Sequence, residues 1–281
     1  MPGAVAVITD STACLAPDLA ARRGIGVVPL RVVAGPAAAD DAPGPPSAPI
    51  EAELRGGARL STASPAPARF AAAYAAAAGA GAAAIASIHL SADLSGTVGS
   101  ARQAAARAPV PVRVVDSRSL GMGLGIAVLA AAEAAAAGRA LDEVAATACD
   151  RSARLRSFFV LDSLDQLSAG GRIAPAPARA GPALTARALL QITDGKIALL
   201  EKVRTRSAAA RRLEELAAEF AAGRPVDLAV QYLGPAARAA ALAGRLERLI
   251  PGARHRYLAE GGAVILAHTG PGVLGVVVAP Y

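Results

Sequence analysis

The alternation of apolar runs with helical segments in the first half of the chain constrains its fold most strongly. Four short apolar runs have the length and composition of β-strands, at 5–8, 26–33, 83–89 and 112–115. Helical segments with start and stop signals lie between or after them, at 17–23, 69–78, 97–108, 123–137 and 141–156. Strands that alternate with helices at this spacing predict a mostly parallel sheet with helical crossovers. The Pro- and Ala-rich segment 35–49 predicts a loop.

A different pattern begins at residue 158. Strands are expected at 158–161, 226–232, 256–258 and 273–278, with helices at 206–222 and 236–249. The dipeptide Asp194-Gly195 is a strong turn signal and predicts a hairpin over 192–200. The chain is therefore expected to form two α/β domains. Residues 1–157 would hold the mostly parallel sheet, and residues 158–281 a mixed sheet.

Composition and charge exclude several classes of protein. Hydrophobic residues make up 54% of the chain, but most of them are Ala and only 3% of all residues are aromatic. The net charge of +7 attracts anions. However, no run of Lys and Arg with interleaved aromatics suggests nucleic-acid binding. The uncharged stretch between Arg69 and Asp93 is expected to form a helix, a turn and a strand rather than a membrane span. Transient contact with a membrane surface remains open.

The two cysteines and the N-terminus indicate the compartment. Cys14 and Cys149 are far apart and lack metal-ligand spacing, so two buried free thiols in a reducing cytosol are expected. The N-terminus lacks the pattern of a signal peptide, because Asp10 interrupts the first apolar run and no basic segment precedes it. A cytoplasmic location is therefore predicted.

Small polar side chains follow three of the predicted strands at the point where each strand ends. Asp10 and Ser11 end the first strand, Ser91 and Thr97 come after the third, and Asp116 ends the fourth. The carboxyl ends of strands in an open parallel sheet line the ligand crevice, so these side chains predict a polar cleft. Alternatively, Asp10 and Asp116 satisfy neighbouring backbone N–H groups at the strand ends.

The segment after the third strand has two interpretations. Ser95, Gly96 and Thr97 open a helix, where free backbone N–H groups and the helix dipole favour an anion. Alternatively, Ser95 or Thr97 only caps the helix. The segment 61–65 has the same two readings, a polar contact or a loop with Ser64 as the N-cap of the next helix.

The three histidines differ in their sequence surroundings. His89 lies inside an apolar strand and is expected to be packed in the interior, while His255 lies between two arginines and is expected at the surface. His268 precedes the turn sequence 269–272 and follows an apolar run, so it is expected in a loop. A histidine in a loop donates a hydrogen bond to a carboxylate and, when protonated, pairs with its charge.

No catalytic or metal-binding set assembles in the sequence. Serine nucleophile elbows, phosphate-binding loops, dinucleotide fingerprints and zinc-protease motifs are absent, and no ligand cluster suggests a metal. Hydroxyl groups, one histidine and a helix N-terminus are typical of a carboxylate-binding site rather than of a reaction centre. The sequence therefore predicts a binding protein without a metal or a cofactor.

Ten short motifs, in order, resemble those of the DegV family of bacterial fatty-acid-binding proteins. They are ITDST (8–12), GI (24–25), VPL (28–30), TASPAP (62–67), LSGT (94–97), DS (116–117), GGRI (170–173), DG (194–195), VRT (203–205) and HTGPG (268–272). The resemblance spans nearly the whole chain.

The resemblance implies a site and a ligand. It implies a long-chain fatty acid at the interface of two α/β domains, with Thr62, Ser95 and His268 bonded to its carboxyl group. The bound acid would be the ligand, with no further cofactor. The polar residues around the strand ends are expected to line the cleft: Asp10, Ser11, Ser91, Gly96 and Thr97.

The resemblance also implies a partner. An ATP-dependent fatty acid kinase would convert the bound carboxylate to an acyl phosphate, and Arg172 and Arg204 match arginines associated with kinase docking. Two other functions remain open from the residues themselves. One is an acyl hydrolase or acyltransferase that uses Ser95 with His268. The other is an interaction module, suggested only by the basic charge.

Overall fold

The protein is described by a computed structural model that covers residues 4–46, 49–50, 52, 58–173 and 187–281. The first half forms a four-stranded parallel sheet in the order β2-β1-β6-β7. Its strands are β1 (Val5–Asp10), β2 (Ile25–Val28), β6 (Ala84–His89) and β7 (Val112–Asp116). The predicted parallel sheet with helical crossovers is confirmed.

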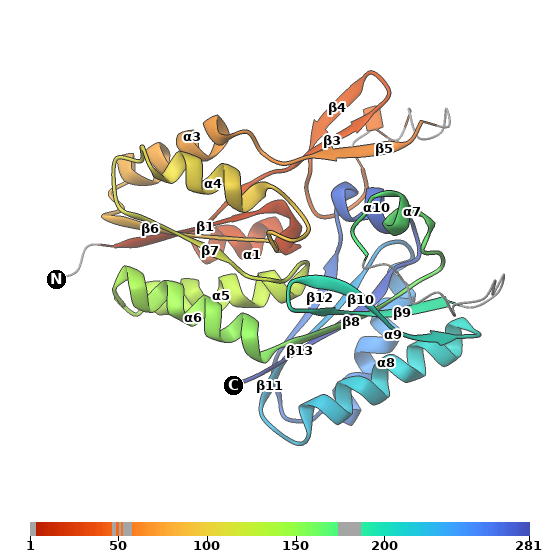
Figure 1. Ribbon diagram of the computed structural model, residues 1–281. Helices are drawn as coiled ribbons and strands as arrows, with labels where there is room; N and C mark the ends of the chain where they lie inside the picture. Colours follow the sequence, from red (N-terminus) through yellow and green to blue (C-terminus); the bar gives the residue numbers. More distant parts are fainter. Residues whose placement is uncertain (1–3, 47–48, 51, 53–57, 174–186) are drawn as a thin grey trace.

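Helices cover both faces of the parallel sheet (Figure 1). On one face lie α3 (Pro67–Gly79) and α4 (Thr97–Ala105), and on the other α5 (Met122–Ala136) and α6 (Leu141–Arg154), while α1 (Pro17–Arg22) precedes β2. Successive residues of β1 point to opposite faces. Val7 therefore belongs to the core under α5, and Ile8 belongs to the core under α3 and α4.

The second half forms a six-stranded mixed sheet in the order β10-β9-β8-β13-β11-β12. Its strands are β8 (Arg156–Leu161), β9 (Arg187–Thr193), β10 (Lys196–Val203), β11 (Val226–Tyr232), β12 (Ala253–Glu260) and β13 (Leu274–Pro280). Only the β11–β12 pair is parallel. The hairpin predicted at Asp194-Gly195 is confirmed, and both turn residues have positive φ, as its tight turn requires.

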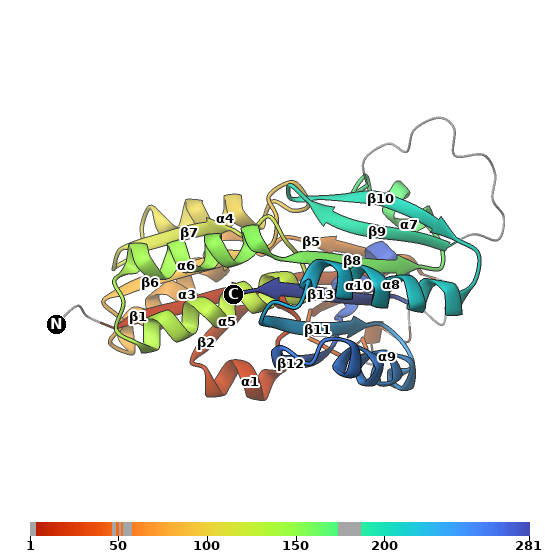
Figure 2. The same cartoon turned by 90° about the horizontal axis from the view of Figure 1, so that it is seen from below.

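Helices α8 (Arg206–Ala221) and α9 (Ala236–Leu249) cover one face of the mixed sheet. Two short helices, α7 (Asp165–Ala169) and α10 (Ala263–Thr269), contact each other. Helix α5 contacts β1 on one side and β11 and β13 on the other, so it lies between the two sheets (Figure 1, Figure 2). The mixed sheet begins with β8, and the division into domains at residue 157 stays a prediction.

A third, antiparallel sheet was not predicted. It comprises β3 (Arg31–Ala34), β4 (Ala37–Asp40) and β5 (Leu60–Ala63), in the order β4-β3-β5. The single strand expected at 26–33 is therefore wrong, because the chain leaves the parallel sheet at Pro29, which has no N–H group for the ladder. The loop expected at 35–49 is also wrong in part. Its Ala-rich residues form β4 because they pair with β3, not because of their own β propensity.

The cysteines are free, as expected, but they differ in burial. Cys14 is buried, and burial beside acidic side chains raises the pKa of its thiol to about 12. Cys149 lies on the exposed face of α6, so the expectation of two buried thiols is wrong for this residue. Among the described helices, none is both long and apolar enough to cross a membrane.

Candidate functional site

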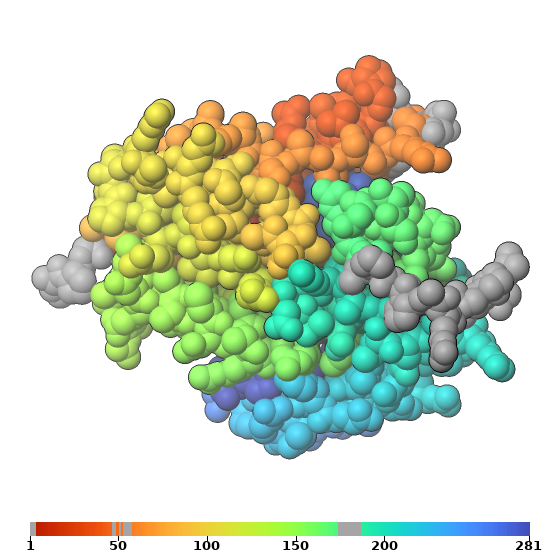
Figure 3. Space-filling model, viewed as in Figure 1, coloured from red at the N-terminus to blue at the C-terminus, as the bar shows by residue number. Residues whose placement is uncertain are grey.

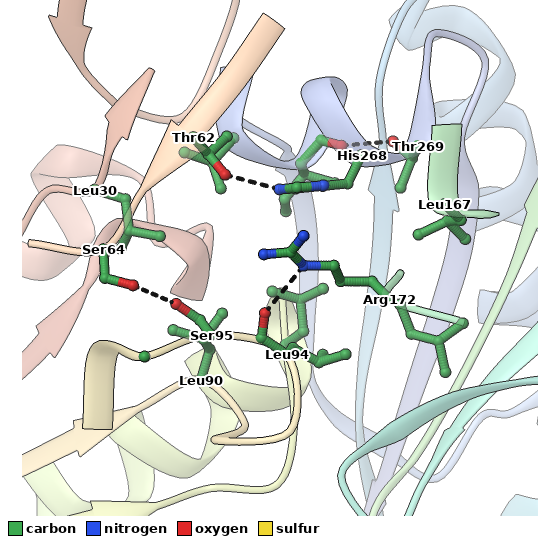
Figure 4. A pocket seen from close by; sticks show the side chains of 15 residues that line it. Leu30, Thr62, Ser64, Leu90, Leu94, Ser95, Leu167, Arg172, His268 and Thr269 are labelled. Atoms are coloured by element: carbon green, nitrogen blue, oxygen red, sulfur yellow. Dashed lines mark hydrogen bonds between the residues drawn. The ribbon is translucent and has the colours of Figure 1, made fainter. Parts of the chain in front are cut away.

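A cavity lies between β5, the loops that follow β6 and β7 of the parallel sheet, the end of β10, and the segments of α7 and α10 (Figure 4). It encloses about 630 Å³ of empty space, which includes space open to solvent. The lining residues are Leu30, Thr62, Ser64, Leu90, Leu94, Ser95, Gly96, Leu120, Leu167, Arg172, Ile197, Val264, Ile265, His268 and Thr269. Figure 3 shows a hollow in the surface between the β3–β5 sheet and the α7 segment.

Thr62 and His268 meet at one wall of this cavity. The Oγ1 atom of Thr62 on β5 lies 2.8 Å from Nε2 of His268, although the two residues are 206 positions apart in the chain. His268 was expected in a loop, but it lies in the last turn of α10. The helix forms because the buried Asp41 carboxylate accepts a hydrogen bond from the Val264 N–H at 3.0 Å. A cap supplied from so far away leaves no local sequence signal.

Hydroxyl groups form the opposite wall. Ser64 Oγ lies 2.9 Å from Ser95 Oγ, which in turn lies 2.9 Å from Thr97 Oγ1. Ser95 also accepts a hydrogen bond from the Thr97 N–H at 3.3 Å. Ser64 is not the N-cap of α3, since Ala66 occupies that position and Pro67 begins the helix. Gly96 lines the cavity beside Ser64.

Arg172 supplies the positive charge of the cavity. It is the only Lys or Arg among the described residues that line it. Its Nε donates to the Leu94 carbonyl at 3.4 Å, and another guanidinium nitrogen donates to the Gly170 carbonyl. Arg204, which the resemblance places in the same role, lies exposed between β10 and α8 and does not line the cavity. The two arginines therefore have different surroundings.

His268 has an altered proton affinity. Burial, followed by the nearby charge of Arg172, lowers the pKa of its imidazole below the usual 6.5. In the free protein at neutral pH the ring is therefore uncharged, and one ring nitrogen donates while the other accepts. A bound carboxylate would act in the opposite direction, because an anion beside the ring favours its protonated form.

The lowered pKa predicts how the stability of the free protein depends on pH. Because the unfolded chain binds the His268 proton more readily than the folded one, the free energy of unfolding should fall as the pH drops below 6.5. Urea unfolding of wild type and His268→Gln at about pH 7.5 and about pH 5.5 measures this difference. The variant should lose less stability on acidification. An equal loss in both proteins would show that His268 does not contribute.

Asp10 is placed in the interior rather than in the cleft. Its side chain is fully buried, and one carboxylate oxygen accepts from the N–H and hydroxyl of Thr12. The other oxygen accepts from the Leu90 N–H at 3.0 Å and lies 3.0 Å from His89 Nδ1. Asp10 therefore joins the ends of β1 and β6, as the alternative interpretation held. His89 is buried as expected.

Three further residues of the predicted cleft also have structural partners. The Ser11 hydroxyl accepts from the Leu30 N–H at 3.1 Å, and the Ser91 hydroxyl donates to the Gly195 carbonyl at 2.7 Å. Thr97 is buried behind Ser95. None of the three lines the cavity. Of the residues predicted to bind the carboxyl group or to line the cleft, Thr62, Ser95, Gly96 and His268 line this cavity, whereas Asp10, Ser11, Ser91 and Thr97 do not.

A second, mostly apolar cavity adjoins the first and was missed by the sequence analysis. It encloses about 470 Å³ of empty space, partly open to solvent. The two cavities adjoin, because Leu120, Ile197, Ile265 and Thr269 line both of them. Its remaining lining residues are Cys14, Gly121, Phe159, Ile192, Gln231, Tyr232, Leu233, Gly261 and Val273. They come from many segments, and no local pattern marks them.

The geometry offers no support for a serine nucleophile at Ser95. Nε2 of His268 is paired with Thr62, and the Ser95 hydroxyl is paired with Ser64 and Thr97. A nucleophilic serine requires a hydrogen bond to its base, and none joins Ser95 to His268 among the described residues. Those residues also contain no cluster of His, Cys, Asp or Glu that could hold a metal ion.

Comparisons with known proteins agree with the resemblance in the sequence. A family model described as "Uncharacterised protein, DegV family" matches residues 4–281. A DegV domain-containing protein from Streptomyces coelicolor is 48% identical over 274 residues, which is 98% of each chain. Protein DegV from Bacillus subtilis is 30% identical over 275 residues, 97% of this chain and 98% of the other.

Solved structures show the same architecture. A Thermus thermophilus DegV family protein, described by its fatty acid binding, has a TM-score of 0.89 and 33% identity, and the match covers 99% of this chain and all of that one. Bacillus subtilis DegV, described as a fatty acid binding protein, also has a TM-score of 0.89 at 29% identity, with 99% and 100% coverage. The mixed α/β fold predicted from the sequence is confirmed.

Proposed function

The chain belongs to the DegV family, and we propose that it binds a long-chain fatty acid in the two adjoining cavities. The carboxyl group would lie between Thr62, Ser95 and His268, and the acyl chain would extend into the apolar cavity. The single observation that carries this proposal is that a cavity with hydroxyl, imidazole and guanidinium groups in its wall adjoins a mostly apolar cavity and shares four lining residues with it. A fatty acid has the same two-part chemistry.

The physical terms fit this ligand. Burying the acyl chain contributes about 0.8 kcal/mol per CH₂ group, so a long chain supplies most of the affinity. A buried carboxylate is costly unless its oxygens are hydrogen-bonded. The hydroxyls of Thr62 and Ser95 and the ring of His268 would supply these bonds.

Binding of stearic acid and of its methyl ester by isothermal titration calorimetry tests the proposed orientation. The ester has the same chain but no charged carboxylate, so it should bind at least about tenfold more weakly. Ser95→Ala should reduce this difference, because it removes one hydroxyl from the proposed carboxyl site. Equal affinity for acid and ester in the wild-type protein would contradict a carboxyl-specific site.

The proposal extends to presentation of the acid to a separate ATP-dependent fatty acid kinase. In that reaction a carboxylate oxygen attacks the terminal phosphorus of ATP, ADP leaves, and an acyl phosphate forms. The family resemblance supports this role, and so does the hollow that opens beside the polar cavity (Figure 3). This chain would bind and orient the acid, and the kinase would supply ATP and the phosphoryl-transfer chemistry.

Under this proposal, replacing Arg172 and replacing Arg204 should have different effects on phosphorylation and on binding of the acid. An acyl phosphate carries more negative charge than a carboxylate, so Arg172 in the cavity should matter more for its formation than for binding of the acid. Arg172→Ala should slow phosphorylation at least about a hundredfold and change the Kd of stearic acid only a few-fold. Arg204→Ala should leave the Kd unchanged and raise the kinase concentration needed for half-maximal rate. Loss of bound acid in Arg204→Ala would contradict this assignment.

A further inference from the structure

The apolar cavity contains one amide side chain in a fixed orientation. Gln231 on β11 lines this cavity, and its Oε1 accepts a hydrogen bond from the Met122 N–H at 2.9 Å. That bond identifies the oxygen end of the amide, because only the oxygen accepts. It ties the first residue of α5 to the mixed sheet.

Glycines on both sides hold this amide in a narrow slot. Gly121 has a φ of +61°, and a Cβ atom there would lie 2.3 Å from Oε1 of Gln231. A Cβ atom at Gly275 would lie 3.2 Å from Cγ of the same side chain. Both glycines therefore leave room for the Gln231 side chain, and its hydrogen bond to the Met122 N–H fixes the position of the amide oxygen.

The amide nitrogen of Gln231 carries two N–H groups that are not used in the bond to Met122. Within the described part of the chain, Nε2 of Gln231 has no hydrogen-bond partner, while the Thr269 hydroxyl and the Cys14 thiol of the same cavity each have one. Thr269 Oγ1 donates to the Ile265 carbonyl at 2.8 Å, and Cys14 Sγ donates to the Thr12 carbonyl at 3.5 Å. The adjacent Tyr232 packs with the core on the other face of the sheet.

We infer that the apolar cavity recognises an acyl chain bearing an oxygen substituent, a hydroxyl or oxo group, which accepts a hydrogen bond from the Gln231 amide. This inference rests on the proposed binding of a fatty acid. An unsubstituted chain that covers the amide N–H groups of Gln231 would take them out of water and offer them no acceptor, which is unfavourable. A double bond is a much weaker acceptor than an oxygen atom. The preferred ligands are therefore hydroxy or oxo fatty acids.

The test compares stearic acid with a set of its isomers that carry one hydroxyl group at successive carbons. Affinities are measured by calorimetry with the full-length wild-type protein and with Gln231→Met, which keeps the length of the side chain but has no donor. Gln231→Glu is a second variant, because it keeps an oxygen acceptor for the Met122 N–H and replaces the amide nitrogen. Within each protein, the ratio of the affinity for a hydroxylated isomer to the affinity for stearic acid is independent of any change in folding stability.

In the wild-type protein, at least one hydroxylated isomer should bind about tenfold more tightly than stearic acid. In Gln231→Met this preference should disappear, while stearic acid itself still binds. The inference is overturned if every isomer binds no better than stearic acid in the wild-type protein, or if the preference survives in Gln231→Met. Failure of stearic acid and all its isomers to bind the wild-type protein would instead overturn the proposed function, and this inference with it.

Discussion

Replacing His268 by alanine should weaken the binding of stearic acid by about ten- to a hundredfold, because a hydrogen bond to a charged group is lost from a buried site. The change removes the ring that faces the cavity and leaves the Thr62 hydroxyl without its 2.8 Å partner (Figure 4). The fold should persist, since His268 lies in the last turn of a short helix that Asp41 caps at its other end. Calorimetry gives the Kd, and circular dichroism checks the fold.

His255→Ala is the matched control for this prediction. His255 is half exposed, bonds to Asp227 and Tyr281, and lies outside both cavities. Its replacement should leave the Kd for stearic acid unchanged. A folded His268→Ala protein with wild-type affinity would mean that the carboxyl group does not lie beside His268.

Replacing Asp10 by alanine should lower the free energy of unfolding by about 3–5 kcal/mol, the cost of removing one partner from a buried charged network. The substitution leaves the backbone N–H groups of Thr12 and Leu90 and the buried ring of His89 without their acceptor. Urea unfolding measures the loss. Asp10→Asn keeps one oxygen and should cost less.

The Asp10 variants also distinguish a structural role from a ligand-binding one. At a temperature where Asp10→Ala is still folded, its affinity for stearic acid should match that of the wild-type protein, because Asp10 is buried outside the cavity. Arg118→Ala is the control, because it changes an exposed side chain and should leave both the stability and the affinity close to those of the wild-type protein. A folded Asp10→Ala protein that fails to bind the acid would show that Asp10 contributes to the binding site.

The parallel sheet and the β9–β10 hairpin were predictable because their signals are local. Buried parallel strands are mostly apolar runs, as at 5–8, and the turn at Asp194-Gly195 needs residues that tolerate positive φ. Helices between the strands carry start and stop residues within a few positions of their ends. Each of these features depends on neighbours in the sequence.

The third sheet and α10 were not predictable because their causes are distant in the chain. Strand β4 is three alanines and an aspartate, and it forms only by pairing with β3. Helix α10 depends on Asp41, more than two hundred residues earlier. The contact between Thr62 and His268 joins the third sheet to α10. At the sequence level, only the family resemblance predicted that these two residues share a site.

Polar residues at strand ends were only partly informative. Asp10 and Ser95 both follow strands, yet one is enclosed by backbone donors and the other faces the cavity. The sequence shows a small polar residue in both places and does not show which of the two becomes buried. The apolar cavity was missed for a related reason, since its lining residues look like any other core residues.

Mass spectrometry of an organic extract from the purified native protein tests the central claim most directly. If the two cavities form a fatty-acid site, the extract should contain about one fatty acid per protein chain, and a stripped protein should take up one equivalent of added acid. An extract without fatty acid, together with no stoichiometric uptake of added stearic acid, would contradict the claim.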